Sequence, residues 1–490
     1  MTGRATTRPH PWWTLVGACT GLFLLMLDST VVALALPKIK DELGASAASL
    51  QWVMNGYLLT ITVLVVTAGR FGDMFGRKRL FVAGMVLFAA GSALAAVADD
   101  DEVLVLARVV QGIGAAPMLS LSLAIVSHAF SRESQPGALG IWAAVSAVAL
   151  AVGPLAGGAL VDLDWRLIFW INLPISVVGV AIILRYAPES RDEGAGTRID
   201  LPGLITLSAG LGATVLALVE SEVWGWGAWH TLALLGAGLA LLALFCVVEQ
   251  RVAEPIIDFA LFRNRPYLGA TAAAFALVGS YWSVMFYEPQ FMQDILGHSV
   301  IASGVLILPV TAPMAVISPL SGRLIERFGA RSLMTAGMLA GTAGLVLLTR
   351  ISADSDYAAL LPGFALFGVA LALVYAPMST AAMTAMPRAK AGIASGVLAM
   401  NRVMAGAIAL AISGAIFQAL RSDRLEQGAG DGEAFASALG DATWFLAALV
   451  AAGSVATWVL LRPAPTPGEA AAPTEGDPTE HHMHHRRFHL

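Results

Sequence analysis

The sequence of 490 residues is 57% hydrophobic and only 13% charged, with a formal net charge of −5. Soluble proteins average about 25% charged residues, so this composition excludes a soluble globular protein and indicates a polytopic membrane protein. The small net charge gives no indication of a nucleic-acid partner. Because Cys19 and Cys246 lie far apart in apolar runs, we expect neither a disulfide framework nor a metal site.

Fourteen apolar runs are long enough to cross a bilayer as helices, which takes about 20 residues. Lys and Arg gather in the loops on the side of the two termini, so we expect both termini to be cytoplasmic. A polar, Gly-rich stretch, 420–441, is expected to be an outer loop. The sequence thus predicts an all-α polytopic membrane protein with 14 transmembrane helices. In chain order the runs are 12–36, 51–69, 80–98, 103–126, 137–160, 167–186, 201–219, 230–249, 267–292, 300–320, 332–350, 358–380, 391–418 and 441–461.

The first run contains one acid, Asp28, and the fourth contains one base, Arg108. A carboxylate within a membrane span persists only when it faces a cavity or a partner. Because desolvation disfavours its charged form, Asp28 is a candidate proton-binding residue. An arginine does not deprotonate in proteins, but Arg108 lies at a similar depth and can hold Asp28 ionised or displace its proton. The alternatives are that Asp28 reaches water at the helix end and that Arg108 extends to the outer acidic loop.

An internal repeat divides the chain. The string GRFGDMFGRK, beginning at Gly69, recurs in outline as GRLIERFGAR, beginning at Gly322. Two parallel halves with a site between them are a transporter architecture. We therefore expect six-helix halves at 1–200 and 250–462, an inserted helix pair (helices 7 and 8) at 201–249, and a disordered cytoplasmic tail at 463–490.

Three further strings occur at comparable positions in a known family: LARVVQGIGAA around Arg108, GPLAGG from Gly153, and WRLIFWINLP from Trp165. Together with the repeat, they resemble the major facilitator superfamily, and within it the fourteen-helix drug:proton antiporters. The resemblance covers the chain to about residue 462. It implies a major facilitator fold and proton transfer involving Asp28 and Arg108.

The resemblance also implies roles for two small-residue motifs. The first is a latch of the outward-facing state, formed at the turn between helices 2 and 3, where Asp73 pairs with an arginine or faces a helix N-terminus of the other half. The second is the helix 5 motif that marks export rather than uptake, with small residues for close helix contact and a proline that bends the helix. The latch residues are Gly69, Asp73, Gly76 and Arg77, and the antiporter motif residues are Gly153, Pro154, Gly157 and Gly158.

Glu288, near the outer end of the ninth helix, departs from the family pattern. Two uses compete: a second proton or cation site in the cavity, or an acid at the membrane interface. Neighbouring aromatic residues, Tyr281, Trp282, Phe286 and Tyr287, are suited either to stacking on an aromatic or cationic drug or to an interfacial belt. The expected substrate cavity consists of Asn55, Tyr57, Gln111, Trp142, Tyr287, Glu288 and Asn401.

The sequence contains four lysines, and none stands in a phosphate-binding loop, which excludes a Walker A ATPase. No nucleophile–base or metal-ligand set indicates an enzyme, a metal or a cofactor. We expect a proton-coupled antiporter, monomeric, in the inner membrane of a bacterium, exporting drug-like small molecules by alternating access. The alternatives are a dedicated exporter of a single endogenous metabolite or antibiotic and, from another class, a non-transporting membrane receptor or scaffold.

Overall fold

The computed structural model describes residues 10–192, 200–252, 255–257 and 259–461. Within these ranges the chain is almost entirely helical and has no strand. The tail predicted at 463–490 lies outside the described residues. The helices are α1 (Pro11–Leu43), α2 (Ala47–Phe75), α3 (Arg77–Ala96), α4 (Asp101–Ala129), α5 (Gln135–Leu163), α6 (Leu167–Trp170), α7 (Asn172–Tyr186), α8 (Leu201–Trp224), α9 (Trp229–Glu249), α10 (Arg265–Gln290), α11 (Val300–Leu306), α12 (Leu308–Ile317), α13 (Ser321–Phe328), α14 (Ala330–Leu348), α15 (Tyr357–Thr384), α16 (Ala391–Glu426) and α17 (Asp431–Leu460).

Thirteen helical segments of the described chain are long and apolar enough to cross a membrane. With α5, which packs along α1 in the same bundle, they make up the fourteen predicted crossings. Two of the crossings are interrupted. The span 167–186 is divided between α6 and α7, and the span 300–320 is divided between α11 and α12, where Pro309 lacks the N–H that a continuous helix needs.

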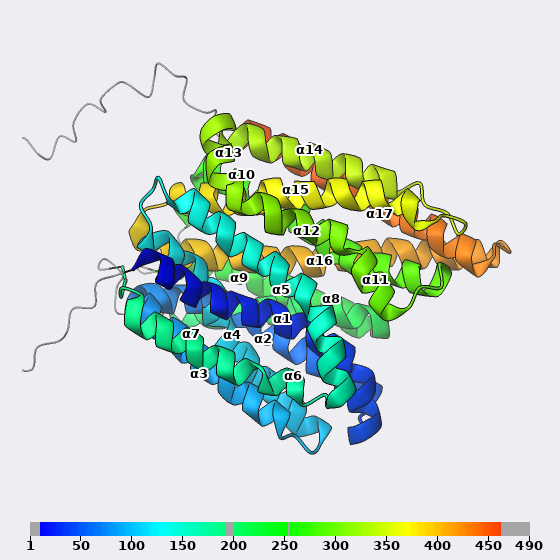
Figure 1. Cartoon of the computed structure of the whole chain (residues 1–490), viewed down its shortest axis with the longest axis horizontal. Helices are drawn as coiled ribbons and strands as arrows, with labels where there is room; N and C mark the ends of the chain where they lie inside the picture. The colour runs from blue at the N-terminus through cyan, green and yellow to red at the C-terminus, as the bar shows by residue number, and fades with distance from the viewer. Residues whose placement is uncertain (1–9, 193–199, 253–254, 258, 462–490) are drawn as a thin grey trace, which may run out of the picture.

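The expected outer loop at 420–441 is wrong. Helix α16 continues to Glu426 and α17 begins at Asp431, so a short turn joins them. The sequence before the turn, RSDRLE, contains good helix formers, and Arg421 and Arg424 form ion pairs with Asp431 and Asp441 of α17. The polar residues of this stretch therefore belong to the ends of α16 and α17, which project together beyond the apolar bundle, and not to a loop (Figure 1).

The helices form two bundles, α1–α7 and α10–α17 (Figure 1). Between the bundles, α2 packs against α16, and α5 packs against α12. The first described helix begins and the last one ends at the same end of the molecule. We call this the proximal end and the opposite one the distal end. The two bundles diverge towards the distal end (Figure 1).

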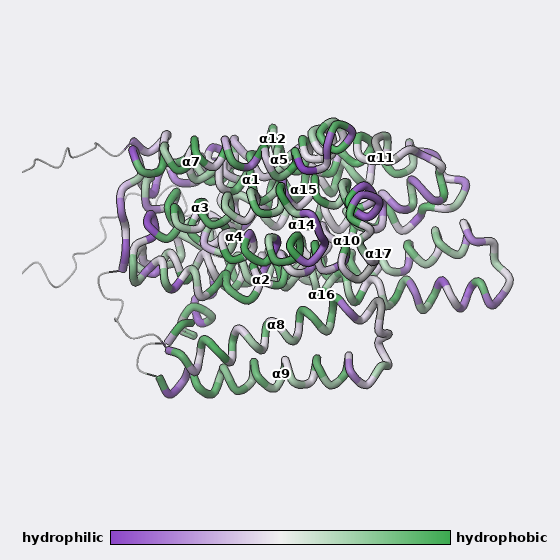
Figure 2. Tube along the Cα trace, turned by 90° about the horizontal axis from the view of Figure 1, so that it is seen from below, coloured by the Kyte–Doolittle hydropathy of each residue, from purple (hydrophilic) through white to green (hydrophobic). Residues whose placement is uncertain are grey.

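Helices α8 and α9 lie as a pair on one side of the molecule (Figure 2). Helix α8 packs against both α2 and α16, and Ser208 Oγ donates a hydrogen bond of 3.3 Å to the Val63 carbonyl of α2. Helix α9 is the outer member and exposes apolar side chains such as Leu232, Leu239 and Leu244. A helix that is apolar on its exposed side is suited to contact with lipid.

Candidate functional site

Asp28 lies within α1 and is fully buried. Its Oδ2 is 2.6 Å from Nη1 of Arg108 on α4, which makes a buried ion pair. Its Oδ1 accepts hydrogen bonds from the side-chain amides of Gln111 at 3.3 Å and Asn172 at 3.4 Å. Both amides also donate to Ser92 Oγ, at 2.7 and 3.2 Å. Helices α1, α3, α4 and α7 therefore supply a complete set of partners for one membrane-embedded acid.

Helix α2 supports Arg108 from another side. Nε of Arg108 donates to the Val53 carbonyl at 3.0 Å, and the guanidinium lies 4.2 Å from the centre of the Tyr57 ring. A cation over an aromatic face is stabilised by the ring quadrupole. Both Asp28 and Arg108 are inaccessible, so the alternatives in which either side chain reaches water or the outer loop are wrong.

The predicted latch residues meet the other half at the proximal end. Asp73 is buried and accepts a hydrogen bond of 2.8 Å from Arg77 Nε. The Asp73 carboxylate also accepts from the backbone N–H groups of Gly392 at 2.9 Å and Ile393 at 2.8 Å. These groups belong to the first turn of α16, where no intrahelical partner exists. Arg77 Nη2 donates to the Ala389 carbonyl at 2.5 Å, so two side chains of one half hold a helix start of the other.

Two glycines of the latch are required by geometry. Gly76 has φ of +110°, a conformation that other residues rarely adopt, and a Cβ there would lie 2.8 Å from the Glu189 carboxylate. A Cβ at Gly69 would lie 2.5 Å from the Gly392 carbonyl oxygen. The first glycine makes the turn, and the second lets α2 and α16 approach closely.

The second copy of the repeated string is built differently. Gly329, with φ of +75°, makes a turn comparable to that at Gly76. Glu326, however, is exposed and has no ion-pair partner among the described residues. Of the two acids in the repeated strings, only Asp73 of the first copy forms hydrogen bonds with the opposite half.

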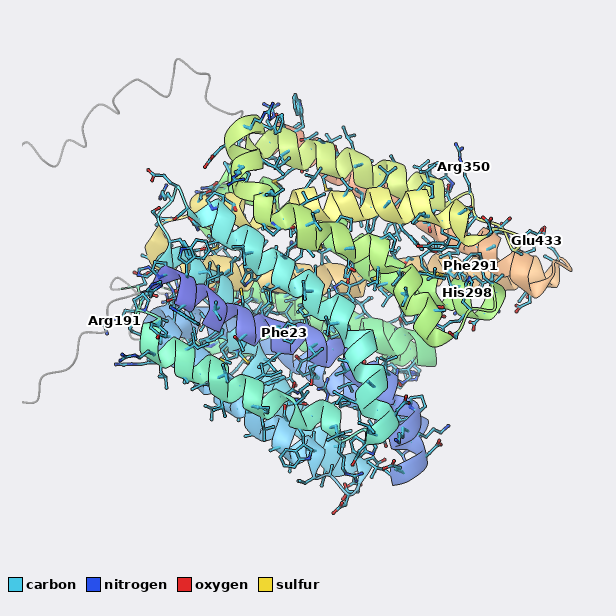
Figure 3. The ribbon with its side chains drawn as sticks, in the orientation of Figure 1. Phe23, Arg191, Phe291, His298, Arg350 and Glu433 are labelled. Carbon is cyan, nitrogen blue, oxygen red and sulfur yellow. The ribbon has the colours of Figure 1, made fainter. Side chains whose placement is uncertain are left out.

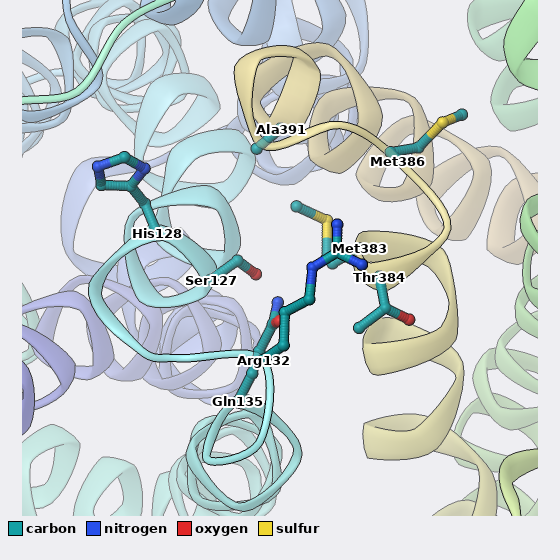
Figure 4. A pocket seen from close by; sticks show the side chains of 8 residues that line it. All are labelled: Ser127, His128, Arg132, Gln135, Met383, Thr384, Met386 and Ala391. Atoms are coloured by element: carbon teal, nitrogen blue, oxygen red, sulfur yellow. The ribbon is translucent and has the colours of Figure 1, made fainter. Parts of the chain in front are cut away.

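The space between the two halves at the proximal end is very small. Residues of α4, the α4–α5 connection, α5 and α15, including His128, Arg132, Gln135 and Met383, surround a crevice of about 10 Å³ (Figure 4). A space of this size holds about one water molecule. This crevice therefore does not admit a drug-sized compound.

A cavity of about 360 Å³ lies between the two bundles, from the middle of the helices towards the distal end. Helices of both halves line it, and α8 adds Leu218 and Val219. Its size falls within the usual range for small-molecule pockets. The polar lining residues are Gln51, Asn55, Ser146 and Arg402, and the aromatic ones are Tyr281, Trp282, Phe286 and Tyr375.

Arg402 of α16 is 8% exposed and borders this cavity. Its Nη2 donates to Ser379 Oγ at 2.6 Å, and its guanidinium lies 4.5 Å from the centre of the Tyr375 ring and 5.6 Å from that of Trp142. Its Nε has no hydrogen-bond partner. Among the described residues, no carboxylate forms an ion pair with it.

The helix 5 motif packs against α1 immediately after Asp28. Gly153 lies against the Thr30 side chain, and a Cβ at Gly157 would be 3.2 Å from the Val31 Cα. Small residues at these positions let α5 and α1 approach closely. Pro154 lies in the same helix, whereas Gly158 has no neighbour that a Cβ would meet.

The predicted cavity is largely wrong, since only Asn55 lines it. Tyr57 lies against Arg108, and Gln111 belongs to the Asp28 cluster. Trp142 of α5 stacks on Tyr375 of α15, between the two bundles. The other members pack inside the second bundle: Tyr287 packs against Phe417, Glu288 is buried outside the cavity lining, and Asn401 donates to the Thr271 carbonyl. Each choice rested on approximate depth, which does not tell which face of a helix a residue occupies.

Sequence reasoning missed Ser92, Asn172 and the cavity position of Arg402. Asn172 lies within the WRLIFWINLP string. The one feature of the sequence that could have identified it is that a polar residue stands at the start of an apolar helix. Arg402 and Arg108 are the two bases that lie away from the ends of the predicted spans, and a base at that depth of a membrane segment indicates function.

The profile of the Major Facilitator Superfamily matches residues 18–410. The chain belongs to the major facilitator superfamily. This membership identifies it as a multi-pass membrane transporter and not an enzyme. The resemblance drawn from its motifs is thereby confirmed.

Curated relatives share the superfamily. The multidrug resistance protein Stp of Mycobacterium tuberculosis is 36% identical over 84% of this chain and 77% of its own. The tetracenomycin C resistance and export protein of Streptomyces glaucescens is 33% identical over 84% of this chain and 76% of its own. The puromycin resistance protein pur8 of Streptomyces alboniger is 35% identical over 82% of this chain and 81% of its own.

Solved structures of distant superfamily members share the fold. The proton:xylose symporter XylE, bound to a bromodeoxyglucose, matches with a TM-score of 0.65 and 13% identity, over 92% of this chain and 96% of its own. The human organic anion transporter MFSD10 matches with a TM-score of 0.64 and 15% identity, over 92% of this chain and 100% of its own. At these identities the likeness concerns the fold alone.

Proposed function

We propose that this transporter is a proton-coupled antiporter that exports drugs or antibiotics from a bacterial cell by alternating access. Its proximal end, with both termini, faces the cytoplasm, and its distal end faces outward across the inner membrane. The distribution of Lys and Arg in the loops supports this orientation. Two bacterial relatives, the tetracenomycin C resistance and export protein and the drug efflux pump JefA, support the direction of transport.

The observation that carries the proposal is the buried Asp28–Arg108 pair and its connection to the cavity through α2. Along one stretch of α2, Asn55 lines the cavity, whereas Val53 and Tyr57 contact Arg108. A change at the ion pair therefore moves the same helix segment that forms part of the cavity wall. Coupling of two sites requires such a shared element with two arrangements.

In the proposed cycle, Asp28 is ionised and paired with Arg108 in the conformation seen here. A proton from the distal side neutralises Asp28 and releases Arg108, which weakens the arrangement of α1, α2 and α4 around the pair. Protonation of this type changes a local charge and thereby shifts the populations of two conformations. The latch opens, the proton leaves to the cytoplasm, and substrate enters from the proximal side.

The proton gradient is sufficient for concentrative export. Moving one charge through about 100 mV supplies roughly 2.3 kcal/mol. Because about 1.4 kcal/mol corresponds to a tenfold concentration ratio, one proton per cycle supports roughly a fiftyfold gradient of a neutral substrate.

A second candidate function is the dedicated export of one antibiotic or metabolite. Two relatives are named for single antibiotics, whereas Stp is named for multidrug resistance. A single cavity serves both functions, so the range of compounds exported distinguishes them. Competition between chemically unrelated compounds for export supports the broad function, and its absence supports the narrow one.

Dye export from cells that lack their own pumps tests the proposal. The cells are loaded with fluorescein or rhodamine 123, which share a xanthene ring and differ in charge. We expect wild-type protein to extrude at least one dye, and both an uncoupler and Asp28→Asn to abolish extrusion. Asp99→Asn, which neutralises an exposed acid at the distal end, is the matched control and should retain extrusion.

Three results would contradict the proposal. Uphill export by Asp28→Asn excludes Asp28 as the coupling residue and makes Glu288 the next candidate. Extrusion that an uncoupler does not affect excludes proton coupling. A wild-type protein that moves neither dye nor any antibiotic favours a receptor or scaffold.

A further inference from the structure

The cavity borders one charged side chain, Arg402, and no Asp or Glu among its described lining residues. Of the four buried arginines of the described chain, Arg77 and Arg108 each form an ion pair with a carboxylate, Asp73 and Asp28 respectively, whereas Arg70 and Arg402 form none. Arg402 has only a serine hydroxyl and two aromatic rings, and its Nε has no hydrogen-bond partner. Among the described residues, Arg402 therefore brings a buried positive charge without a counter-charge to the wall of the cavity.

A guanidinium in this position is strongly stabilised by an anion. It keeps its charge because arginine does not deprotonate in proteins. A buried charge without a partner is unfavourable by several kcal/mol, and the stacking on Tyr375 and Trp142 compensates only about 0.5–2 kcal/mol of this. The Nε of Arg402 is thus available to an anion that enters the cavity.

We propose, on the basis of the proposed export function, that Arg402 is the recognition residue for an acidic group on the cargo. The cargo class is a flat aromatic compound that carries a carboxylate or an acidic phenol. Its anionic oxygen approaches the free Nε edge of Arg402, because guanidinium donors match carboxylate oxygens in pairs. A cationic drug is disfavoured, since it adds a second positive charge and finds no acid in the lining.

The rest of the cavity fits this class. Tyr375 lies directly under the guanidinium, and Tyr281, Trp282 and Phe286 provide ring faces on the α10 side. Aromatic rings in offset-stacked or edge-to-face geometry add to the affinity for a flat ligand. Asn55 Nδ2, which has no partner, supplies one more donor in the lining. The described lining thus offers two unpartnered donors and no carboxylate.

Binding to the purified protein in detergent tests the proposal without any requirement for transport. Fluorescein, an anion, and rhodamine 123, a cation, are the matched probes, and fluorescence polarisation gives Kd. We expect fluorescein to bind more tightly than rhodamine 123. Arg402→Gln should weaken fluorescein binding roughly tenfold to hundredfold, the range for a lost hydrogen bond to a charged group. Arg402→Lys keeps the charge but loses the planar pair of donors, so its Kd for fluorescein should lie between those of wild type and Arg402→Gln.

Arg350→Gln is the control, because Arg350 is exposed at the distal end and borders no part of the cavity (Figure 3). It should leave both Kd values unchanged. Rhodamine 123 binding should stay the same or tighten in Arg402→Gln, which a merely structural role for Arg402 would not produce. If fluorescein binds no better than rhodamine 123, or if Arg402→Gln leaves the charge preference unchanged, the proposal is wrong.

Transport assays separate this proposal from the export function. In liposomes with an imposed pH gradient, Asp28→Asn should bind fluorescein normally and not accumulate it. If wild-type protein binds the anion through Arg402 but shows no gradient-driven flux, the proton-coupled function fails and the charge preference stands. If flux is proton-driven but Arg402→Gln exports both dyes as wild type does, the charge preference fails and the export function stands.

Discussion

The two halves of the chain each bury an arginine inside a long helix, and they treat its charge in opposite ways. In the first half, Arg108 lies 2.6 Å from Asp28, and amides and a tyrosine ring complete its surroundings. In the second half, Arg402 stacks on aromatic rings and forms no ion pair with any carboxylate that the structure describes. The Asp28–Arg108 pair changes its charge when Asp28 binds a proton, whereas the Arg402 guanidinium is suited to binding an anion. If both proposals hold, the first half binds the proton and the second half binds the cargo.

The largest difference between the two halves is expected when each arginine is replaced. Arg108→Gln leaves Asp28 buried without a cation, so we expect a loss of about 3–5 kcal/mol in the free energy of unfolding. Arg402→Gln removes a buried charge that has no carboxylate partner, so the free energy of unfolding should stay the same or rise. Unfolding in detergent measures both. The double variant Asp28→Asn/Arg108→Gln should recover part of the loss, and equal losses at the two arginines would contradict the comparison.

Adding an acid beside Arg402 should make the second half resemble the first. Ser379 Oγ is 2.6 Å from Arg402 Nη2, so Ser379→Asp places a carboxylate on the guanidinium. We expect fluorescein to bind roughly tenfold to hundredfold more weakly, since the site then has its own counter-charge. Ser379→Asn, of the same size without charge, is the control. Unchanged fluorescein affinity in Ser379→Asp would show that the anion binds elsewhere.

The two repeated loops provide a smaller contrast. Asp73 accepts two N–H groups of α16, whereas Glu326 is exposed. Asn keeps one acceptor oxygen but loses the charge that pairs with buried Arg77, and hydrogen bonds to a charged group are worth about 1.5–3 kcal/mol. Asp73→Asn should therefore shift the conformational equilibrium towards proximal opening by at least roughly tenfold. Spin labels at positions 132 and 387, in a Cys246→Ser background, report the opening. Glu326→Gln should leave the distance distribution as in wild type, and an equal shift would contradict a one-sided latch.

Glu288→Gln should have the smallest effect. Glu288 is 1% exposed, and its Oε2 has no partner, so the neutral amide of similar size should fit. We expect a change in unfolding free energy within about 0.5 kcal/mol and retained proton-driven export. Dye extrusion, measured beside Asp28→Asn, checks this. A loss of export as complete as in Asp28→Asn would assign Glu288 to proton coupling as well.

Much of this architecture could be predicted because the bilayer imposes it. An apolar run of fixed length, a charged residue within it and the side on which Lys and Arg gather are one-dimensional signals. They sufficed for the fourteen crossings and for placing Asp28 and Arg108 at similar depth. The stretch 420–441 escaped the same reasoning, since α16 and α17 continue as helices beyond the apolar region.

The cavity could not be predicted in the same way, because its lining depends on the rotation of each helix about its axis. Asn401 and Arg402 are adjacent in sequence, yet the first donates to α10 and the second borders the cavity. In a helix that is apolar on every side, no hydrophobic periodicity tells which of the two faces inward. The same ambiguity explains why Tyr57 and Gln111, chosen as cavity residues, belong to the Asp28 cluster instead.

The inserted pair α8–α9 has a consequence for how such a transporter changes its cargo over evolution. Helix α8 lies outside the repeat, yet Leu218 and Val219 form part of the cavity wall. Substitutions there reshape the pocket without altering the Asp28 cluster or the Asp73 latch. The two repeated halves can therefore keep these residues while the shape of the pocket changes through a segment that the repeat does not include.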